Sequence, residues 1–208
     1  MKIPSKEECL KLFDRYKVPD NILLHSKKVT EVSLFLAEKL IEKGAEIDLE
    51  LVESGALLHD LMKAVVLEKL AVDEKFKLKE VTREQIEMWQ ELKKKYAGKH
   101  ETEATYDILK DDYPEFAIFI RDIGVIRDNL ENVSWEEKIV HYADWRVFVD
   151  DIVSLQERLE DLHNRYHGKS TKDQEITWDA KSKVQFTSEK EIFDMIGMKP
   201  EELGERLK

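Results

Sequence analysis

Apolar residues recur at helical spacing along most of this chain. The first clear stripe runs through Val29, Leu36 and Leu40, and His25 stands four residues before Val29. Residues three or four apart lie on one face of a helix, so the spacing predicts a helix over 22–43. His25 is therefore expected to open the buried side of this helix.

A second apolar stretch leads into the sequence GALLHDLMKA at positions 55–64. Asp48 is suited to cap a helix that starts there. His59 and Asp60 stand side by side within the apolar run, where an ionised group is costly unless it finds a partner. Lys63 follows His59 by four residues and Asp60 by three, so the spacing predicts that it shares their helical face.

The strongest periodic pattern covers residues 134–166. Ser134 and Glu137 have the spacing of a capping box, and the apolar period continues to the end of this range without a break. We therefore predict one long helix. Valines stand four residues before and three residues after Asp144, which places this carboxylate on the apolar stripe.

The region between these helices is highly charged. A helix over 81–96 is predicted from the capping-box spacing of Thr82 and Gln85, within an insert of about 71–99. Its apolar side is thin, and Trp89 either packs the insert onto the core or covers a bound base. Shorter helices are predicted over 100–112 and 114–123.

The composition changes beyond Gly168. The runs EITW and KVQF alternate like strands and would pair as a short hairpin, and Ser188 would cap a following helix. We predict an all-α fold, with a helical bundle domain over 1–167 and an accessory C-terminal segment over 168–208 that packs on it.

Composition and charge narrow the class of protein. The chain has 208 residues, 42% of them apolar, with 45 acidic and 34 basic side chains and a formal charge of −11. An acidic chain is a poor general binder of nucleic acid or anionic membranes, although a local basic pocket for a small phosphorylated ligand is compatible with it. The single Cys9 and the lack of a signal-like or membrane-spanning apolar run predict a cytoplasmic protein.

Three predicted helices each place polar groups on a buried stripe. Two imidazoles (His25, His59) and two carboxylates (Asp60, Asp144) would form a mixed nitrogen and oxygen ligand set. Such a set suits Mn, Fe, Co, Ni or Zn better than a metal that prefers thiolates. With an open coordination position, the metal would lower the pKa of a bound water and supply a hydroxide nucleophile.

These residues also carry a family resemblance. The order H…HD…D, with the doublet in LLHDLMK and the last aspartate in YADWRV, resembles the HD superfamily of metal-dependent phosphohydrolases over about residues 20–166. The resemblance implies an all-α bundle that holds one divalent metal ion, Mg included among the candidates. It also implies a phosphomonoesterase or phosphodiesterase that attacks a nucleotide or related small phosphate ester with metal-bound hydroxide. Its metal ligands would be His25, His59, Asp60 and Asp144.

Further roles follow for neighbouring residues. Asp60 would orient or deprotonate the attacking water through its second oxygen. Lys63 and His100 would bind the substrate and offset phosphate charge, and Arg146 would contact phosphate. Lys63 can instead pair with Asp60 or a nearby glutamate, His100 can bind a second metal, and Arg146 can pair with Asp150.

One departure from the dinuclear branches of that family favours a single metal. Those branches often carry a further histidine where this chain reads FIRDIGVIRDN, and Asp122 is the nearby candidate ligand. Among the other histidines, His141 is either a partner of a ligand or a surface residue, and His163 and His167 are expected on the surface.

Two other classes of function remain open from the sequence. The same helical core can retain a metal or nucleotide with little or no catalysis and act as a regulatory module. Alternatively, it can be a plain interaction protein whose polar core residues satisfy one another. A stoichiometric divalent ion would separate the first two classes from the third. The sequence does not predict the oligomeric state.

Overall fold

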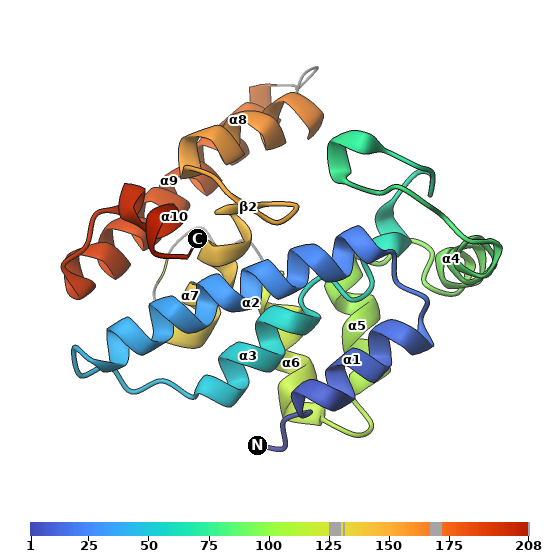
Figure 1. The fold of residues 1–208 in the computed structure, drawn as a ribbon, viewed down its shortest axis with the longest axis horizontal. Helices are drawn as coiled ribbons and strands as arrows, with labels where there is room; N and C mark the ends of the chain where they lie inside the picture. The colour runs from blue at the N-terminus through green and yellow to red at the C-terminus, as the bar shows by residue number, and fades with distance from the viewer. Residues whose placement is uncertain (125–129, 131, 167–171, 208) are drawn as a thin grey trace.

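A computed structural model describes residues 1–124, 130, 132–166 and 172–207, and these residues form an all-α fold, as predicted. Three helices form its centre: α2 (Asp20–Ile41), α3 (Leu49–Leu58) and α7 (Trp135–Asp144). The helix α2 crosses the middle of the molecule and packs against both α3 and α7 (Figure 1). The three segments that carry the predicted ligands are therefore neighbours in space.

The other elements surround this centre. Only one two-stranded antiparallel sheet, β1–β2, occurs among the residues described. In chain order the remaining elements are α1 (Lys6–Arg15), η1 (Lys63–Val66), η2 (Glu74–Phe76), α4 (Arg83–Lys95), α5 (Glu101–Leu109), α6 (Pro114–Ile123), β1 (Val147–Phe148), β2 (Asp151–Ile152), α8 (Leu155–Tyr166), α9 (Lys172–Ile196), η3 (Pro200–Glu202) and α10 (Leu203–Arg206).

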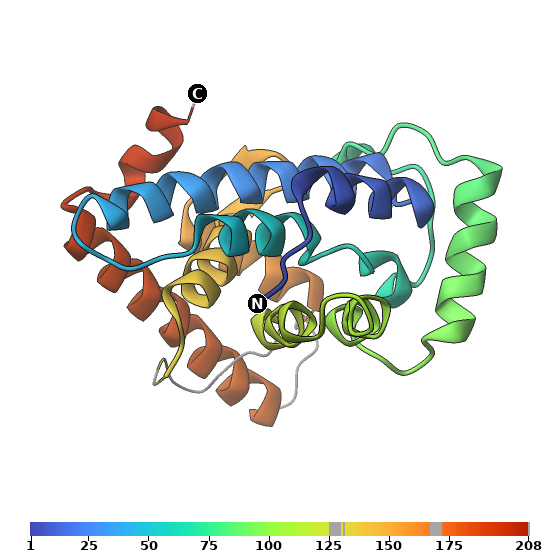
Figure 2. The same cartoon turned by 90° about the horizontal axis from the view of Figure 1, so that it is seen from below.

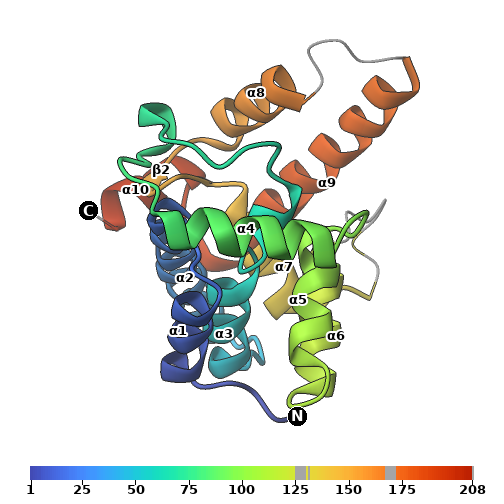
Figure 3. The same cartoon turned by 90° about the vertical axis from the view of Figure 1, so that its right-hand side faces the viewer.

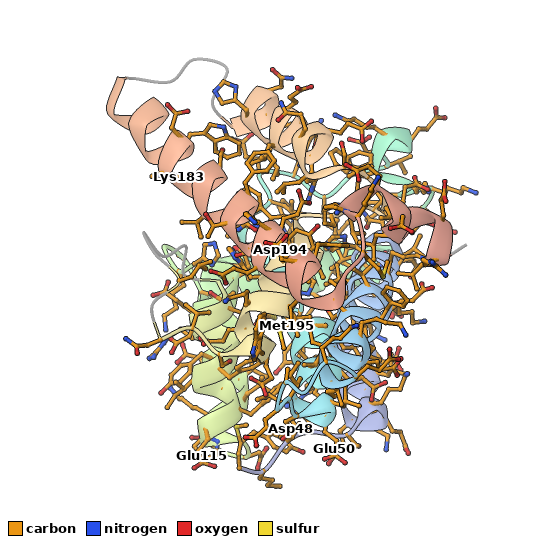
Figure 4. All side chains as sticks on the ribbon, turned by 90° about the vertical axis from the view of Figure 1, so that its left-hand side faces the viewer. Asp48, Glu50, Glu115, Lys183, Asp194 and Met195 are labelled. Atoms are coloured by element: carbon orange, nitrogen blue, oxygen red, sulfur yellow. The ribbon has the colours of Figure 1, made fainter. Side chains whose placement is uncertain are left out.

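The helix α3 ends earlier than the sequence predicted. Asp48 caps its start, as expected, by accepting from the amides of the first turn (Figure 4). Gly55 lets α6 approach closely, because a Cβ there would lie 2.5 Å from the ring of Phe119. The last helical residue is Leu58, and His59 is the C-cap. The prediction that the doublet and Lys63 share one helical face is therefore wrong: the doublet lies in a turn before η1.

The predicted long helix over 134–166 is also wrong, because it breaks after Asp144. The chain turns there into the β1–β2 hairpin before α8 begins. Ser154 and Glu157 form a second capping box, with the Ser154 amide donating to Glu157 at 2.8 Å and the Glu157 amide donating to the Ser154 hydroxyl at 3.2 Å. This pair begins α8, and its capping-box spacing is a local signal that the prediction of one continuous helix did not take into account.

The C-terminal hairpin expected from EITW and KVQF does not form. Both runs lie in the single helix α9, which packs along α2, α7 and α8 (Figures 3 and 4). Val184, Ser188 and Ile192 are buried at helical spacing, so Ser188 lies inside the helix and does not cap a new one. No glycine or proline separates the two runs, and helix continuation therefore competes well with a turn.

The insert is anchored to the core through α4, which packs on η1. The helix α4 forms as predicted, with the Thr82–Gln85 capping box, and stands at one edge of the molecule (Figure 2). Trp89 donates from Nε1 to the carbonyl of Ala64 at 2.9 Å, so this ring packs the insert onto η1. None of the helices in the described ranges is both long and apolar enough to cross a membrane.

Candidate metal centre

Four predicted side chains converge where α2, the end of α3 and the end of α7 meet. We call His25, His59, Asp60 and Asp144 the ligand cluster. The Oδ1 atom of Asp144 lies 3.0 Å from Nε2 of His25 and 3.6 Å from Nε2 of His59. The Oδ2 atom of Asp60 lies 3.9 Å and 3.8 Å from the same two nitrogens. The sequence therefore identified a real spatial cluster from residues more than a hundred positions apart.

Backbone carbonyls orient both imidazoles in the same way, with Nδ1 facing the backbone. Nδ1 of His25 lies 3.2 Å from the carbonyl oxygen of Val149, and Nδ1 of His59 lies 2.7 Å from that of Ala56. A carbonyl oxygen can only accept, so each Nδ1 carries the proton. In the neutral rings, both Nε2 lone pairs therefore point into the cluster, which is the arrangement of metal-bound histidines.

This arrangement requires a positive charge between the side chains. An Nε2 lone pair and a carboxylate oxygen both accept, so they approach to 3.0 Å only when a proton or a metal ion lies between them. Nε2 of His59 is buried and has no hydrogen-bond partner, and an orphaned polar atom of this kind is costly unless something binds it. The ligand cluster is therefore a group of facing acceptors that a proton or a metal ion can bridge.

The pKa shifts follow from the same geometry. Burial alone would lower the pKa of His59, but the nearby charges of Asp60 and Asp144 outweigh burial and raise it to about 9. Burial would raise the pKa of Asp144, and its contacts with His25 and His59 instead hold that pKa well below the usual range. In the metal-free protein, a proton on His59 thus offsets part of the charge of the two carboxylates.

A divalent ion fits the donor set. Two ligands of an ion bound at about 2.1 Å lie about 3.0 to 3.4 Å apart, and the distances of 3.0, 3.6, 3.8 and 3.9 Å in the cluster come close to this range. His25, His59 and Asp144 offer ligand atoms that all lie within 4.8 Å of one another. The Asp144 side chain is 31% exposed, so solvent reaches one side of the cluster.

Lys63 lies beside the cluster but is paired with two acids. Its Nζ atom donates to Oε1 of Glu101 at 2.8 Å and lies 3.4 Å from Oδ1 of Asp60. Burial alone would lower the pKa of Lys63, but these carboxylates outweigh burial and raise the pKa above its usual value. Of the two predicted roles, the ion pair with Asp60 and a nearby glutamate is the one that the contacts display.

His100 is joined to the cluster through Glu101. It caps α5, and its Nε2 atom lies 3.2 Å from Oε2 of Glu101. His100 also borders a hollow of about 530 Å³ between η1, the end of α4 and the start of α5. The lining of this hollow includes Lys93 and Lys99 together with His100 and no carboxylate. The hollow is thus lined by two lysines, of which Lys99 also pairs with Asp107 outside the lining.

Arg146 lies outside the ligand cluster, in a set that we call the arginine cluster (Tyr142, Arg146, Glu189). The guanidinium donates to the carbonyls of Val153 at 2.7 Å and Pro200 at 3.1 Å, to Glu189 at 3.1 Å, and to the Tyr142 hydroxyl. The side chain is 3% exposed. Arg146 therefore ties the C-terminal segment to α7, which does not support the predicted phosphate contact or the pairing with Asp150. Asp150 pairs instead with Lys77.

The remaining predicted residues are scattered. Asp122 pairs with Arg121 at 3.0 Å, and His141 accepts from Gln185 at 3.0 Å. The ring of His163 lies 5.6 Å from that of Trp178, and His167 lies outside the described residues. The structure does not bring these residues to the ligand cluster.

The sequence did not predict three groups of the site. Glu101 is buried beneath Lys63, and the carbonyls of Ala56 and Val149 orient the two imidazoles. Glu101 follows the N-cap of α5, where acidic residues are common, so its position carried no special signal. A backbone acceptor has no residue type at all and can only be seen in three dimensions.

Comparison with known proteins gives a similarity over part of the chain. No protein-family model and no solved structure matches it. One curated protein, the tRNA (cytidine(56)-2'-O)-methyltransferase of Thermoplasma volcanium, is 36% identical over 64 residues. The match covers 31% of this chain and 18% of that protein, so the chain spans about a fifth of the length of this relative.

This similarity corrects the predicted activity. The relative is named for methyl transfer to a 2'-oxygen of tRNA, and no hydrolase matches the chain at the same level. The prediction of a phosphohydrolase, whether a phosphomonoesterase or a phosphodiesterase, is therefore wrong on this comparison. The all-α fold and the ligand cluster stand independently of it, since they rest on the structure.

Proposed function

We propose that this protein is a divalent-metal-binding helical module that binds a nucleotide or another small phosphorylated ligand beside the metal. The observation that carries the proposal is that two buried imidazoles, each held at Nδ1 by a backbone carbonyl, aim Nε2 at the same carboxylate oxygens. His25, His59, Asp60 and Asp144 would hold the ion, in agreement with the H…HD…D pattern of the HD superfamily. Membership of that superfamily is part of the proposal.

The hollow next to His100 supports the second part of the proposal. A bound divalent ion would supply a Lewis-acidic contact for a phosphate oxygen. The two lysines that line the hollow offer further positive charge, while Val65 and Val66 add apolar surface. A volume of about 530 Å³ lies within the range of small-molecule sites. We therefore expect the ligand to reach from the ligand cluster into this hollow.

Metal analysis tests the first part. Protein purified without chelators, or reconstituted with Mn, Co, Ni, Zn or Mg, should bind one equivalent of a divalent ion. His59→Ala should lose that ion, whereas His163→Ala removes a histidine outside the ligand cluster and should keep it. Equal metal content in both variants would refute the assignment of the ligands.

Ligand binding tests the second part. Calorimetry with ADP should show tighter binding to the metal-loaded protein than to the metal-free protein. Lys99→Met, in the hollow, should weaken ADP binding, whereas Lys95→Met at the end of α4 lies outside the lining and should not. ADP binding that is independent of both the metal and Lys99 would rule out this mode of binding.

The partial similarity favours a second candidate, 2'-O-methylation of tRNA. The match over 64 residues is the observation for it. Incubation of the protein with tRNA and S-adenosylmethionine carrying a labelled methyl group tests this candidate directly. Label transferred to tRNA would support it, and the lack of transfer by metal-loaded protein would leave the metal and nucleotide module as the better account.

A further inference from the structure

The β1–β2 hairpin and α7 both contact His25. Nε2 of His25 lies 3.0 Å from Asp144, and Nδ1 of His25 lies 3.2 Å from the carbonyl of Val149. Two groups only five residues apart in the chain thus hold opposite nitrogens of one imidazole ring. In a continuous helix the Val149 carbonyl would accept from the amide four residues later and would lie about 140° around the axis from Asp144, so the break after Asp144 frees it for the contact with His25.

The backbone of Val149 adopts an unusual conformation to make this contact. Its φ is +57°, in the left-handed region that β-branched residues rarely enter. Val149 occupies the first central position of the turn that joins Phe148 to Asp151, where hairpin turns of this geometry usually carry glycine. Strained backbone of this kind persists only where surrounding contacts impose it, and it concentrates at functional sites.

Surrounding contacts hold the turn at both ends. At its base, the amide of Val153 donates to the carbonyl of Arg146 at 2.9 Å. At its tip, Lys77 from the insert pairs with Asp150 and, at 2.9 Å, with Asp151. The Phe76 and Phe148 rings lie 5.8 Å apart, so the tip of the insert rests beside the hairpin (Figures 1 and 3).

We propose that Val149 is a positioning residue whose left-handed backbone fixes His25 with its Nε2 lone pair toward the metal. The inference rests on the proposed metal site, because the orientation of His25 matters only if Nε2 is a ligand. Loss of a hydrogen bond to a metal-bound histidine weakens metal binding by about 10-fold to 100-fold.

Three variants at this position separate the backbone from the side chain. Val149→Pro fixes φ near −65° and removes the left-handed conformation, while the preceding Phe148 is already extended, as a residue before proline prefers. Val149→Gly keeps the left-handed conformation without strain, and Val149→Ala keeps the strain but loses the buried side chain. We expect Val149→Pro to bind Zn²⁺ about 10-fold to 100-fold more weakly, and Val149→Gly and Val149→Ala to bind within about threefold of the natural protein.

An NMR measurement gives a readout that general destabilisation would not move. In the natural protein and in Val149→Gly, the Nδ1 proton of His25 should exchange slowly with water, because it is bonded to the Val149 carbonyl. In Val149→Pro it should exchange rapidly while the backbone amides of α2 stay protected. Equal Zn²⁺ affinity and an equally protected Nδ1 proton in Val149→Pro would overturn the proposal.

The two proposals fail in distinguishable ways. If the natural protein binds no Zn²⁺, the metal site fails, and with it the role of Val149 in metal binding. If Zn²⁺ binds through His25 but Val149→Pro leaves the affinity and the Nδ1 proton unchanged, only the positioning role fails. Should Val149→Pro not fold, Val149→Gly with an unprotected Nδ1 proton would equally overturn the proposal, since glycine preserves the turn.

Discussion

The ligand cluster and the arginine cluster stand only two residues apart in the chain, at Asp144 and Arg146, yet they differ in one decisive respect. In the arginine cluster, each nitrogen of the guanidinium donates to an oxygen. In the ligand cluster, Nε2 of His59 is buried without a hydrogen-bond partner, and lone pairs face carboxylates. A saturated buried network stabilises the fold, whereas an open one indicates a binding site.

Replacing Arg146, the centre of the arginine cluster, should have the largest effect of the predicted variants. Arg146→Met removes the charge that pairs with Glu189 and the donor of two part-buried carbonyls, so we expect a loss of about 3 to 5 kcal/mol in the free energy of unfolding. Chemical denaturation measures it. Metal stoichiometry of the remaining folded protein should not change. A loss of stability under about 1 kcal/mol would show that the arginine cluster is not a structural support.

Replacing a member of the ligand cluster should affect metal binding more than folding. Asp144→Asn removes the carboxylate closest to both Nε2 atoms, and we expect Zn²⁺ affinity to fall more than about 100-fold, beyond the loss typical of groups that only support a ligand. Competition with a chromophoric chelator measures this. Asp122→Asn, at the residue paired with Arg121, is the matched control and should keep its affinity. A loss in the control would point to a second metal.

The pH dependence should separate the two clusters further. In the metal-free protein the pKa of His59 is raised to about 9, above its unfolded value of about 6.5. The resulting stabilisation is complete below pH 6.5 and is lost as the pH rises through 9. Metal binding has the opposite sign, because the ion must displace a proton from His59, so affinity should fall up to about tenfold per unit below pH 9.

Thermal unfolding from pH 6.5 to 9 provides the measurement. The difference in Tm between metal-loaded and metal-free protein should widen as the pH rises, since the metal-free form weakens while the metal binds more tightly. His59→Ala should show no such widening. A constant difference in the natural protein would mean that His59 is not a ligand.

The contact between the insert and the hairpin should have the smallest effect. Lys77→Met removes ion pairs that are largely exposed to solvent, and such pairs contribute only about 0.2 to 1 kcal/mol. Zn²⁺ affinity should change less than about threefold, because the base of the hairpin still holds Val149. A change of tenfold or more would show that the insert, and not the turn itself, controls the orientation of His25.

The similarity to a tRNA methyltransferase illustrates a limit of motif reasoning. The pattern of histidines and aspartates predicted side chains that do meet in space, but it also led to an activity that the comparison does not support. A ligand set fixes which ion can bind far better than it fixes the reaction carried out next to it, because function depends on the surrounding site.

The amino-acid sequence by itself determined the all-α class, the caps of α3, α4 and α7, and the identity of the four polar residues that meet in the core. Helical periodicity and capping are local, so they can be read from neighbours in the chain. Polar residues on an apolar stripe must find partners, which is why His25, His59 and Asp144 could be grouped without coordinates.

Only the tertiary structure decided how those residues are held. It ended α3 at Leu58 and turned the chain into the β1–β2 hairpin after Asp144, because packing and backbone hydrogen bonds outweighed local periodicity. It also paired Lys63 with Glu101 and directed the Val149 carbonyl onto His25. These contacts join residues far apart in the chain, and one of the groups involved is a backbone carbonyl that no residue type encodes.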